Sequence, residues 1–251
     1  MKYCFKKKIQ FISSPFDISS INFLYKHKLN IIKIPSSEID NVPYLEEISK
    51  KFKNIILSTG MSNTKEIKFA LDILRNGIKK NIALLHCVSA YPTPKTEVNL
   101  NLISKLKKLF NLNVGFSDHT LGIDIPVYAV YAGANIIEKH FTLNKNLKGP
   151  DHKISLSPKE LNKMIQNIRI AEKILGSDDK KITNCEKSNF KIVRKSIVAK
   201  IDIKKGDKFS KFNLTTKRPR NGVSPIFWNK LLGKRSKFNY KPDQPLKKNE
   251  I

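Results

Sequence analysis

The feature that most constrains the fold of this chain is a short apolar run that recurs about every 20 to 30 residues. These runs are rich in β-branched residues and lack polar alternation, which is typical of strands buried on both faces of a parallel sheet. The predicted strands are Gln10–Ser13, Ile31–Ile34, Asn54–Ser58, Ile82–Cys87, Asn113–Ser117 and Asn135–His140. Helical spacing is found at Ser19–His27, Thr64–Asn76, Asn99–Phe110, Ile123–Ala132 and Pro158–Leu175. The alternation predicts an α/β fold with a parallel sheet.

Polar side chains at the carboxyl ends of the predicted strands decide between two architectures. An open doubly wound sheet and a closed (β/α)₈ barrel both fit the repeat, but a barrel gathers the ends of all its strands at one active site. We therefore favour a TIM-type barrel, which needs eight strands where six are predicted. Because the chain opens only a few residues before a strand, we expect two βα units to be missing before Met1. Such a barrel cannot close, and its apolar edges would be exposed to aggregation.

The C-terminal part of the chain has a different pattern. A polar stretch follows the last long helix, and beyond it short β-like runs at Lys195–Lys200 and Leu214–Lys217 alternate with turn sequences. One more short helical stretch lies near Phe227–Leu232. We predict a partial barrel at residues 1–176, a linker at 177–190 and a small β-rich domain at 191–251.

Composition narrows the functional classes. The 251 residues carry a net charge of +27, nearly all of it from lysines that are spread through helices and loops without aromatic interleaving. That distribution argues against a specific nucleic acid site, although it would steer a small anionic substrate toward the protein. No apolar run has the length of a signal peptide or a membrane helix, and the three cysteines lack paired spacing. We therefore expect a cytoplasmic protein with reduced thiols and without a disulfide framework.

Two predicted strands end in histidine. His119 follows Ser117 and Asp118 in the string GFSDHT, and His140 follows Glu138 in IIEKHFT. Neighbouring barrel strands would bring both imidazoles within reach of one divalent ion and leave positions open for substrate and water. In this hypothesis Asp118 and Glu138 orient the two rings. The alternative is a pair of core histidines with ordinary hydrogen bonds.

Two further strand ends have the chemistry of an anion site. Lys33 stands in a buried strand, where its ammonium needs an anionic partner, and Ser36, Ser37 and Glu38 follow it. The next strand ends in Ser58 and Thr59. Small hydroxyls beside backbone amides can complete a cradle for a phosphate or a carboxylate. A lysine held in a salt bridge beside ordinary turn residues would have the same sequence.

Two loops add candidate polar contacts. The loop HCVSAYPTP presents Ser89 and Tyr91 toward the same end of the sheet, although the tyrosine could equally cover the edge of the core. In the loop KGPDHKISLSP, Asp151 could accept hydrogen bonds from sugar hydroxyls, whereas His152 has no indicated role.

Taken together, these strings closely resemble the bacterial N-acetylneuraminate synthase family, which includes the pseudaminic and legionaminic acid synthases. FISSPF, KIPSSE, ILSTGM, HCVSAYPTP, GFSDHT, EKHFT and GPDHKISLSP occur in the order of that family. The tail, with SIVAKIDIKKGD and TTKRPRNG, resembles the antifreeze-like (SAF) domain of its members. Family members also begin with two strands that this chain lacks.

The resemblance implies a (β/α)₈ barrel that joins phosphoenolpyruvate to the aldehyde of an open-chain N-acetylated amino sugar. The sugar would be N-acetylmannosamine or a diacetamido-trideoxyhexose, and the products a nonulosonic acid and phosphate. A divalent metal, usually manganese, with magnesium or cobalt as alternatives, would polarise the aldehyde. The expected assembly is a domain-swapped homodimer, and a separate N-terminal polypeptide is a further expected partner.

The resemblance also assigns roles by position. His119 and His140 would be the metal ligands and, with Glu38, the catalytic residues. Phosphoenolpyruvate would be bound by Lys33, Ser36, Ser58, Ser89 and Ser117. The sugar would be contacted by Glu38, Tyr91 and Asp151, and by Arg218 from the small domain of a partner subunit.

Two other hypotheses remain open at this point. The chain could be a catalytically dead remnant that acts as a binding or scaffold protein, in which case a metal would not stabilise it. It could instead bind nucleic acid through its lysines, in which case retention on DNA would survive competition with heparin. For the synthase hypothesis we expect this chain to be inactive until the absent units are supplied.

Overall fold

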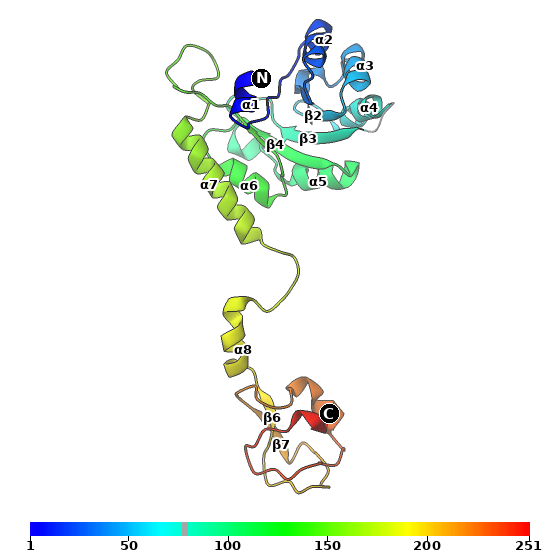
Figure 1. The fold of residues 1–251 in the computed structure, drawn as a ribbon, viewed down its shortest axis with the longest axis vertical. Helices are drawn as coiled ribbons and strands as arrows, with labels where there is room; N and C mark the ends of the chain where they lie inside the picture. The colour runs from blue at the N-terminus through cyan, green and yellow to red at the C-terminus, as the bar shows by residue number, and fades with distance from the viewer. Residues whose placement is uncertain (77–79) are drawn as a thin grey trace. The chain divides into compact units, whose positions relative to one another are not determined.

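The computed structural model describes residues 1–76 and 80–251 (Figure 1). The chain divides into two compact units, Met1–Gly176 and Ser177–Ile251. The larger unit contains the predicted sheet and the smaller unit the predicted β-rich tail. The two units are described separately below.

The larger unit is built on a parallel sheet in the order β1-β2-β3-β4-β5. The strands are β1 (Ile31–Ile34), β2 (Asn54–Ser58), β3 (Asn81–Cys87), β4 (Asn113–Asp118) and β5 (Ile137–Lys139). Strands that are consecutive in sequence are neighbours in the sheet, which is the strand order of a βα barrel. The result is an α/β fold with a parallel half-barrel sheet, which confirms the predicted α/β class and the parallel sheet.

Helices cover one face of this sheet (Figure 1). They are α2 (Ile18–Lys26), α3 (Val42–Lys51), α4 (Thr64–Arg75), α5 (Asn101–Phe110), α6 (Asp124–Tyr131) and α7 (Pro158–Leu175). The helix α7 begins at a capping box in which Ser157 and Glu160 bond each other's backbone amides, and Pro158 occupies its first turn. An apolar cluster around Val130 and Met164 joins α6 to α7.

The strand pleat sends alternate side chains to the helix-covered face and to the helix-free face of the sheet. Ile32, Leu57 and Phe116 are fully or almost fully buried among helical side chains, in the main core. Because successive residues of a strand point to opposite faces, Lys33 and Ser117 lie on the face turned away from the helices. The polar residues of the candidate site are therefore collected on one side of the sheet.

The prediction of a strand at Gln10–Ser13 is wrong except at its last residue. Ser13 forms an isolated parallel bridge with Ile32, and the Lys33 N–H donates to the Ser13 carbonyl at 3.1 Å. The rest of the segment is irregular and follows a short helix, α1 (Lys2–Lys6). Phe11 and Ile12 are about 40% exposed, so their burial does not stabilise an edge strand in the described chain.

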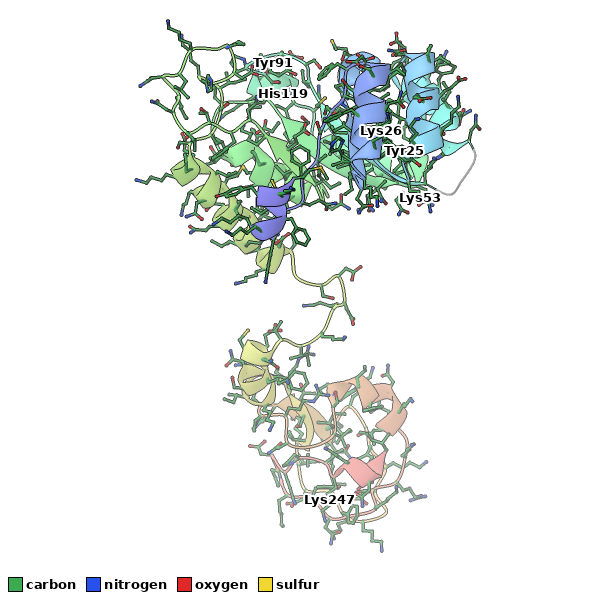
Figure 2. The ribbon with its side chains drawn as sticks, turned by 45° about the horizontal axis from the view of Figure 1, so that its top comes forward. Tyr25, Lys26, Lys53, Tyr91, His119 and Lys247 are labelled. Atoms are coloured by element: carbon green, nitrogen blue, oxygen red, sulfur yellow. The ribbon has the colours of Figure 1, made fainter. Side chains whose placement is uncertain are left out.

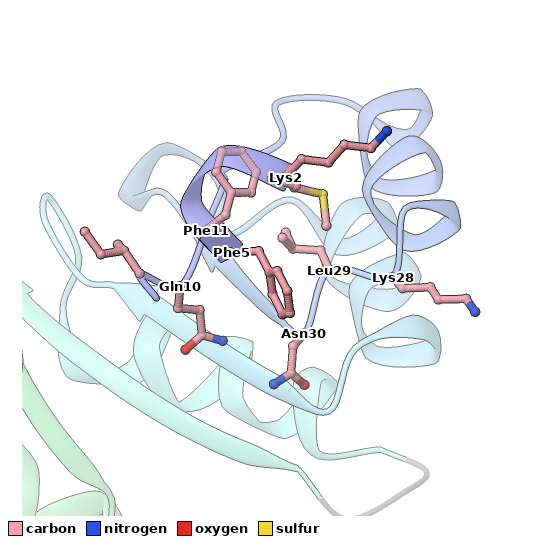
Figure 3. A pocket seen from close by; sticks show the side chains of 9 residues that line it. Lys2, Phe5, Gln10, Phe11, Lys28, Leu29 and Asn30 are labelled. Carbon is pink, nitrogen blue, oxygen red and sulfur yellow. The ribbon is translucent and has the colours of Figure 1, made fainter. Parts of the chain in front are cut away.

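An apolar pocket of about 590 Å³ lies beside this segment (Figure 3). Phe5 of α1, Phe11 and Leu29 are among the side chains that line the pocket. Leu29 precedes β1, so the pocket opens at the amino end of that strand. The pocket therefore lies at the end of the sheet opposite to the predicted reactive residues.

The smaller unit has its own core. Antiparallel strands β6 (Ser196–Ala199) and β7 (Leu214–Lys217) pair, and α9 (Trp228–Leu231) follows them. Ile197, Phe209 and Tyr240 are almost fully buried in its apolar cluster. The segment predicted as a linker is partly helical, because α8 (Lys187–Val193) begins within it. In the part of the chain that is described, no helix is long and apolar enough to cross a membrane.

Candidate active site

A row of polar side chains crosses the helix-free face of the sheet near the carboxyl ends of the strands. Lys33 of β1, Ser117 of β4 and Glu138 of β5 are linked directly. The Lys33 ammonium lies 3.2 Å from both carboxylate oxygens of Glu138, and the Ser117 hydroxyl donates to Glu138 Oε1 at 2.6 Å. Three strands separate β1 from β5 in the sheet, so this contact shows that the sheet curves enough to bring β1 toward β5.

This contact gives Lys33 the anionic partner that its burial requires. The Lys33 side chain is 11% exposed and that of Glu138 is 43% exposed, so one end of the pair faces open space. The ammonium can therefore also meet an anionic ligand that enters from the side of Glu138. Neither the contact nor the role of Glu138 was predicted from the sequence, although a lysine in an apolar strand is the signal that an acid must be near.

A second cluster surrounds Gly60, immediately after β2. The Gly60 N–H donates to Ser36 Oγ at 2.8 Å, and that hydroxyl lies 3.3 Å from Cys87 Sγ. A Cβ atom on Gly60 would lie 2.3 Å from Ser89 Oγ, 2.8 Å from Cys87 Sγ and 3.0 Å from Ser36 Oγ. Two hydroxyls and a thiol thus converge on one glycine, and a residue without a side chain leaves the most space between them.

Ser58 precedes this cluster at the end of β2. It is 3% exposed, and its hydroxyl has no hydrogen-bond partner among the residues described. A buried hydroxyl without a partner is costly and rare, so such a group is best explained by a ligand or a water molecule that bonds it. A cavity of about 830 Å³ opens beside the next residue, Thr59, and is also lined by Cys87 and Ser89.

His119 is placed by the backbone of a neighbouring loop. Its Nδ1–H donates to the Val88 carbonyl at 2.8 Å, which leaves the lone pair on Nε2, 3.4 Å from Ser117 Oγ. Burial lowers the pKa of His119 below 6.5, the nearby His140 adds to that effect, and the Val88 carbonyl opposes it. The ring is therefore neutral at physiological pH and presents a free nitrogen to the site.

The second histidine lies close by. The ring centroids of His119 and His140 are 5.5 Å apart and the rings are steeply inclined to each other. Tyr91 stacks on His119 with centroids 4.3 Å apart, and Figure 2 shows the two side chains together. Asp151 Oδ2 lies 3.8 Å from His140 Nδ1, and burial is the main cause of a raised pKa of Tyr91. The structure thus brings Tyr91, Asp151 and both histidines together.

The prediction that Asp118 orients a histidine ring is wrong. Asp118 instead forms a buried ion pair with Lys139, on the opposite face of the sheet from His119. The predicted ring partner Glu138 is likewise engaged by Lys33 and Ser117. A backbone carbonyl fixes the His119 ring in place of a carboxylate, because consecutive strand residues cannot point to the same face.

Two predicted residues are not brought to this cluster by any hydrogen bond of the structure. Glu38 is held within its own loop by the Asn41 amide at 2.7 Å and is half-buried. Arg218 belongs to the smaller unit, where it follows β7 and is exposed. Their predicted contacts with a sugar stay predictions.

The donor set fits part of a metal site. His119 offers Nε2 of a neutral ring, and His140 lies at a distance from which both rings could share one ion. Within residues 1–76 and 80–251, however, no group of three or more His, Cys, Asp or Glu side chains could hold a metal ion. A metal held here would therefore complete its coordination with substrate or water oxygens.

Comparison with known proteins decides the family. The sequence profile of the NeuB family matches residues 1–180 of the chain. The chain belongs to the NeuB family. The profile of the SAF domain matches residues 194–251, within the smaller unit.

Proteins similar to this chain include synthases of legionaminic and pseudaminic acids. The N,N'-diacetyllegionaminic acid synthase of Campylobacter jejuni is 54% identical over 95% of this chain and 72% of its own length. The synthase of the same name from Legionella pneumophila is 43% identical over 92% of this chain and 66% of its own length. The crystal structure of the N-acetylneuraminic acid synthetase of Leptospira borgpetersenii aligns with a TM-score of 0.71 and 38% identity, covering 75% of this chain and 66% of that one.

Proposed function

We propose that this NeuB-family chain condenses phosphoenolpyruvate with an N-acetylated amino sugar, consuming water and giving a nonulosonic acid and phosphate. The observation that carries the proposal is the hydroxyl cradle around Gly60, which lies among the same strand ends as a buried lysine and two adjacent histidines. An anion cradle beside a pair of metal-type donors suits the joining of an anionic donor to a carbonyl acceptor.

The cradle would hold the phosphate and carboxylate groups of phosphoenolpyruvate. Ser36, Ser58 and Ser89 supply hydroxyls on the side of β2 and β3, and Ser117 supplies one on β4. Lys33 supplies the positive charge, and binding of the ligand would shift its ammonium from Glu138 toward the ligand. This exchange explains why an ionic contact is left partly open to solvent.

His119 and His140 would hold a divalent metal, which we propose to be manganese, with magnesium or cobalt as alternatives. When bound, the metal polarises the sugar aldehyde as a Lewis acid. The residues of the chain orient the ligand ring. The Val88 carbonyl keeps the His119 lone pair on Nε2, and Tyr91 covers one face of that ring. The carbon–carbon bond then forms between the enol carbon of the bound donor and the aldehyde carbon of the sugar.

The sugar would lie on the outer side of the histidines. Tyr91 and Asp151 border that side and are more than half exposed, so they are available to a polar ligand. We propose that Glu38 and, from the small domain of a partner subunit in a domain-swapped homodimer, Arg218 complete this subsite. The three free cysteines among the described residues suit a cytoplasmic reaction.

We further propose that the sheet is completed by two more strand–helix units, on this or a separate polypeptide. In the described chain β1 and β5 are the edges of an open sheet, and apolar residues such as Phe5 and Ile9 are largely exposed near β1. An added strand beside Ser13 would cover these side chains and extend the single bridge into a ladder. Without those units we expect the chain to be inactive.

The test is manganese-dependent release of phosphate from phosphoenolpyruvate, measured with N-acetylmannosamine and with a diacetamido-trideoxyhexose as acceptors. The 251-residue chain is assayed alone and after fusion of its N-terminus to the first two strand–helix units of the Campylobacter jejuni relative. The proposal predicts sugar-dependent release by the fusion, and loss of that release in His119→Ala. Full activity of the alanine variant would refute the role of His119, and an inactive fusion that is folded would favour a binding or scaffold protein.

A further inference from the structure

The last two strands of the sheet end in three successive cross-strand pairs. Ser117 is aligned with Glu138, and Asp118 with Lys139, in the parallel ladder between β4 and β5. Immediately beyond, the rings of His119 and His140 lie edge to face with their centroids 5.5 Å apart. The first and third pairs lie on the helix-free face, and the middle pair lies on the opposite face, as the pleat requires.

The middle pair is an ion pair that is almost completely removed from water. Lys139 Nζ lies 2.6 Å from Asp118 Oδ2, and the two side chains are 3% and 0% exposed. Burying two charges in this way is expensive, and apolar residues of similar size can replace such pairs without loss of stability. The pair is therefore poorly explained as a source of stability alone.

Both members of the pair also form hydrogen bonds with the backbone of Thr120, the residue that follows His119. Asp118 Oδ1 accepts from the Thr120 N–H at 2.9 Å, and the Lys139 ammonium donates to the Thr120 carbonyl. The residues on either side of His119, Asp118 and Thr120, thus both bond Lys139, which directly precedes His140. The backbone of His119 is also held through its carbonyl, which accepts from the Thr93 N–H at 3.0 Å.

We infer that Asp118 and Lys139 are positioning residues, whose buried ion pair fixes the spacing and orientation of His119 and His140. The pair joins β4 to β5 at the level at which β5 ends, so without it the two strand ends that carry the rings lose the side-chain link that joins them directly. This inference rests on the proposed metal site, since a fixed spacing of two imidazoles matters most when both bind one ion.

The test separates positioning from stability with a charge-free double variant, Asp118→Asn with Lys139→Met. Each single variant leaves one buried charge unpaired and should lower the melting temperature of the full chain, whereas the double variant should recover most of that loss. The affinity for Mn²⁺, measured by titration calorimetry, should remain about 10- to 100-fold weaker in the double variant. The matched control, Glu47→Gln with Lys51→Met, removes an ion pair of α3 that is 3.0 Å long and should leave the affinity unchanged.

A second readout does not depend on the metal. In the metal-free chain, nuclear Overhauser contacts between the ring protons of His119 and His140 should be present in the parent protein and weakened in the double variant. If the double variant does not fold, Asp118→Asn alone is measured, because it removes the ion pair but keeps the Lys139 side chain that donates to the Thr120 carbonyl.

The outcomes distinguish a failure of the positioning role from a failure of the proposed metal site. Restored melting temperature with weakened Mn²⁺ binding and weakened ring contacts supports the inference. Restored melting temperature with parent-like Mn²⁺ affinity and parent-like ring contacts would overturn it and leave the pair a purely structural feature. If the parent chain does not bind Mn²⁺, the proposed metal site fails, and the ring contacts alone decide whether the pair positions the histidines.

Discussion

Filling the space beside Gly60 should strongly weaken anion binding while leaving the chain folded. Gly60 has no positive φ angle, so alanine is compatible with its backbone. The new Cβ would approach three movable side-chain atoms, the closest being Ser89 Oγ at 2.3 Å. The Ser89 hydroxyl can rotate away and the thiol of the buried Cys87 must also shift, so we expect Gly60→Ala to fold with a loss of about 1–3 kcal/mol.

The same rotation should weaken the binding of phosphoenolpyruvate. Turning one hydroxyl out of the cradle removes at least one hydrogen bond to a charged group, which contributes about 1.5–3 kcal/mol. The affinity for phosphoenolpyruvate should then fall by about 10- to 150-fold. Titration calorimetry of the full chain measures this affinity, and urea unfolding checks the stability.

Ser62→Ala is the matched control for this substitution. The Ser62 hydroxyl donates to the Gly60 carbonyl at 3.0 Å, so its removal loosens the same turn without filling the cradle. We expect it to weaken phosphoenolpyruvate binding only slightly. Parent-like binding by Gly60→Ala, or equal losses in both variants, would refute the assignment of the cradle.

Three further predictions concern single side chains. Ser58→Ala removes a buried hydroxyl without a partner, so stability measured by urea unfolding should be unchanged or higher, while phosphoenolpyruvate binding weakens about tenfold or more. Burial lowers the pKa of His119 below 6.5, so the unfolded chain binds protons more readily and the free energy of unfolding should decrease as the pH falls through 6.5. This decrease with pH should be shallower in His119→Gln. Equal pH dependences of the two proteins would contradict the prediction. Glu250→Ala leaves the Tyr240 hydroxyl and the Lys237 N–H without their acceptor. Unfolding followed by Trp228 fluorescence should show the smaller unit destabilised by about 2–4 kcal/mol. A loss below about 0.5 kcal/mol would refute this prediction.

Much of the sheet could be predicted from the sequence because parallel strands are recognisable by local composition. Four predicted strands, beginning with Ile31–Ile34, are formed with bounds within one residue or so, and α7 spans Pro158–Leu175 as its capping residues indicate. The helix α3 was not predicted, although Asn41 as its cap and Pro43 in its first turn are local signals. The strand at Gln10–Ser13 failed because strand formation there depends on a partner, which no local pattern reveals.

The candidate site was predictable only as a set of strand ends. Which side chains share a face follows from the pleat, and that rule places Asp118 on the opposite face from His119, against the prediction that Asp118 orients one of the two rings. The contacts of Glu138 with Lys33 depend on the curvature of the sheet, and the cradle around Gly60 depends on three loops meeting. Such long-range contacts are not encoded in the spacing of residues along the chain.

The most direct measurement is the anomalous diffraction of manganese in crystals of the chain soaked with Mn²⁺ and phosphoenolpyruvate. We predict one anomalous peak between the Nε2 atoms of His119 and His140, with ligand density extending from Ser117 to the hydroxyls around Gly60. A peak elsewhere, or ligand density away from these residues, would contradict the proposed site and with it the proposed reaction.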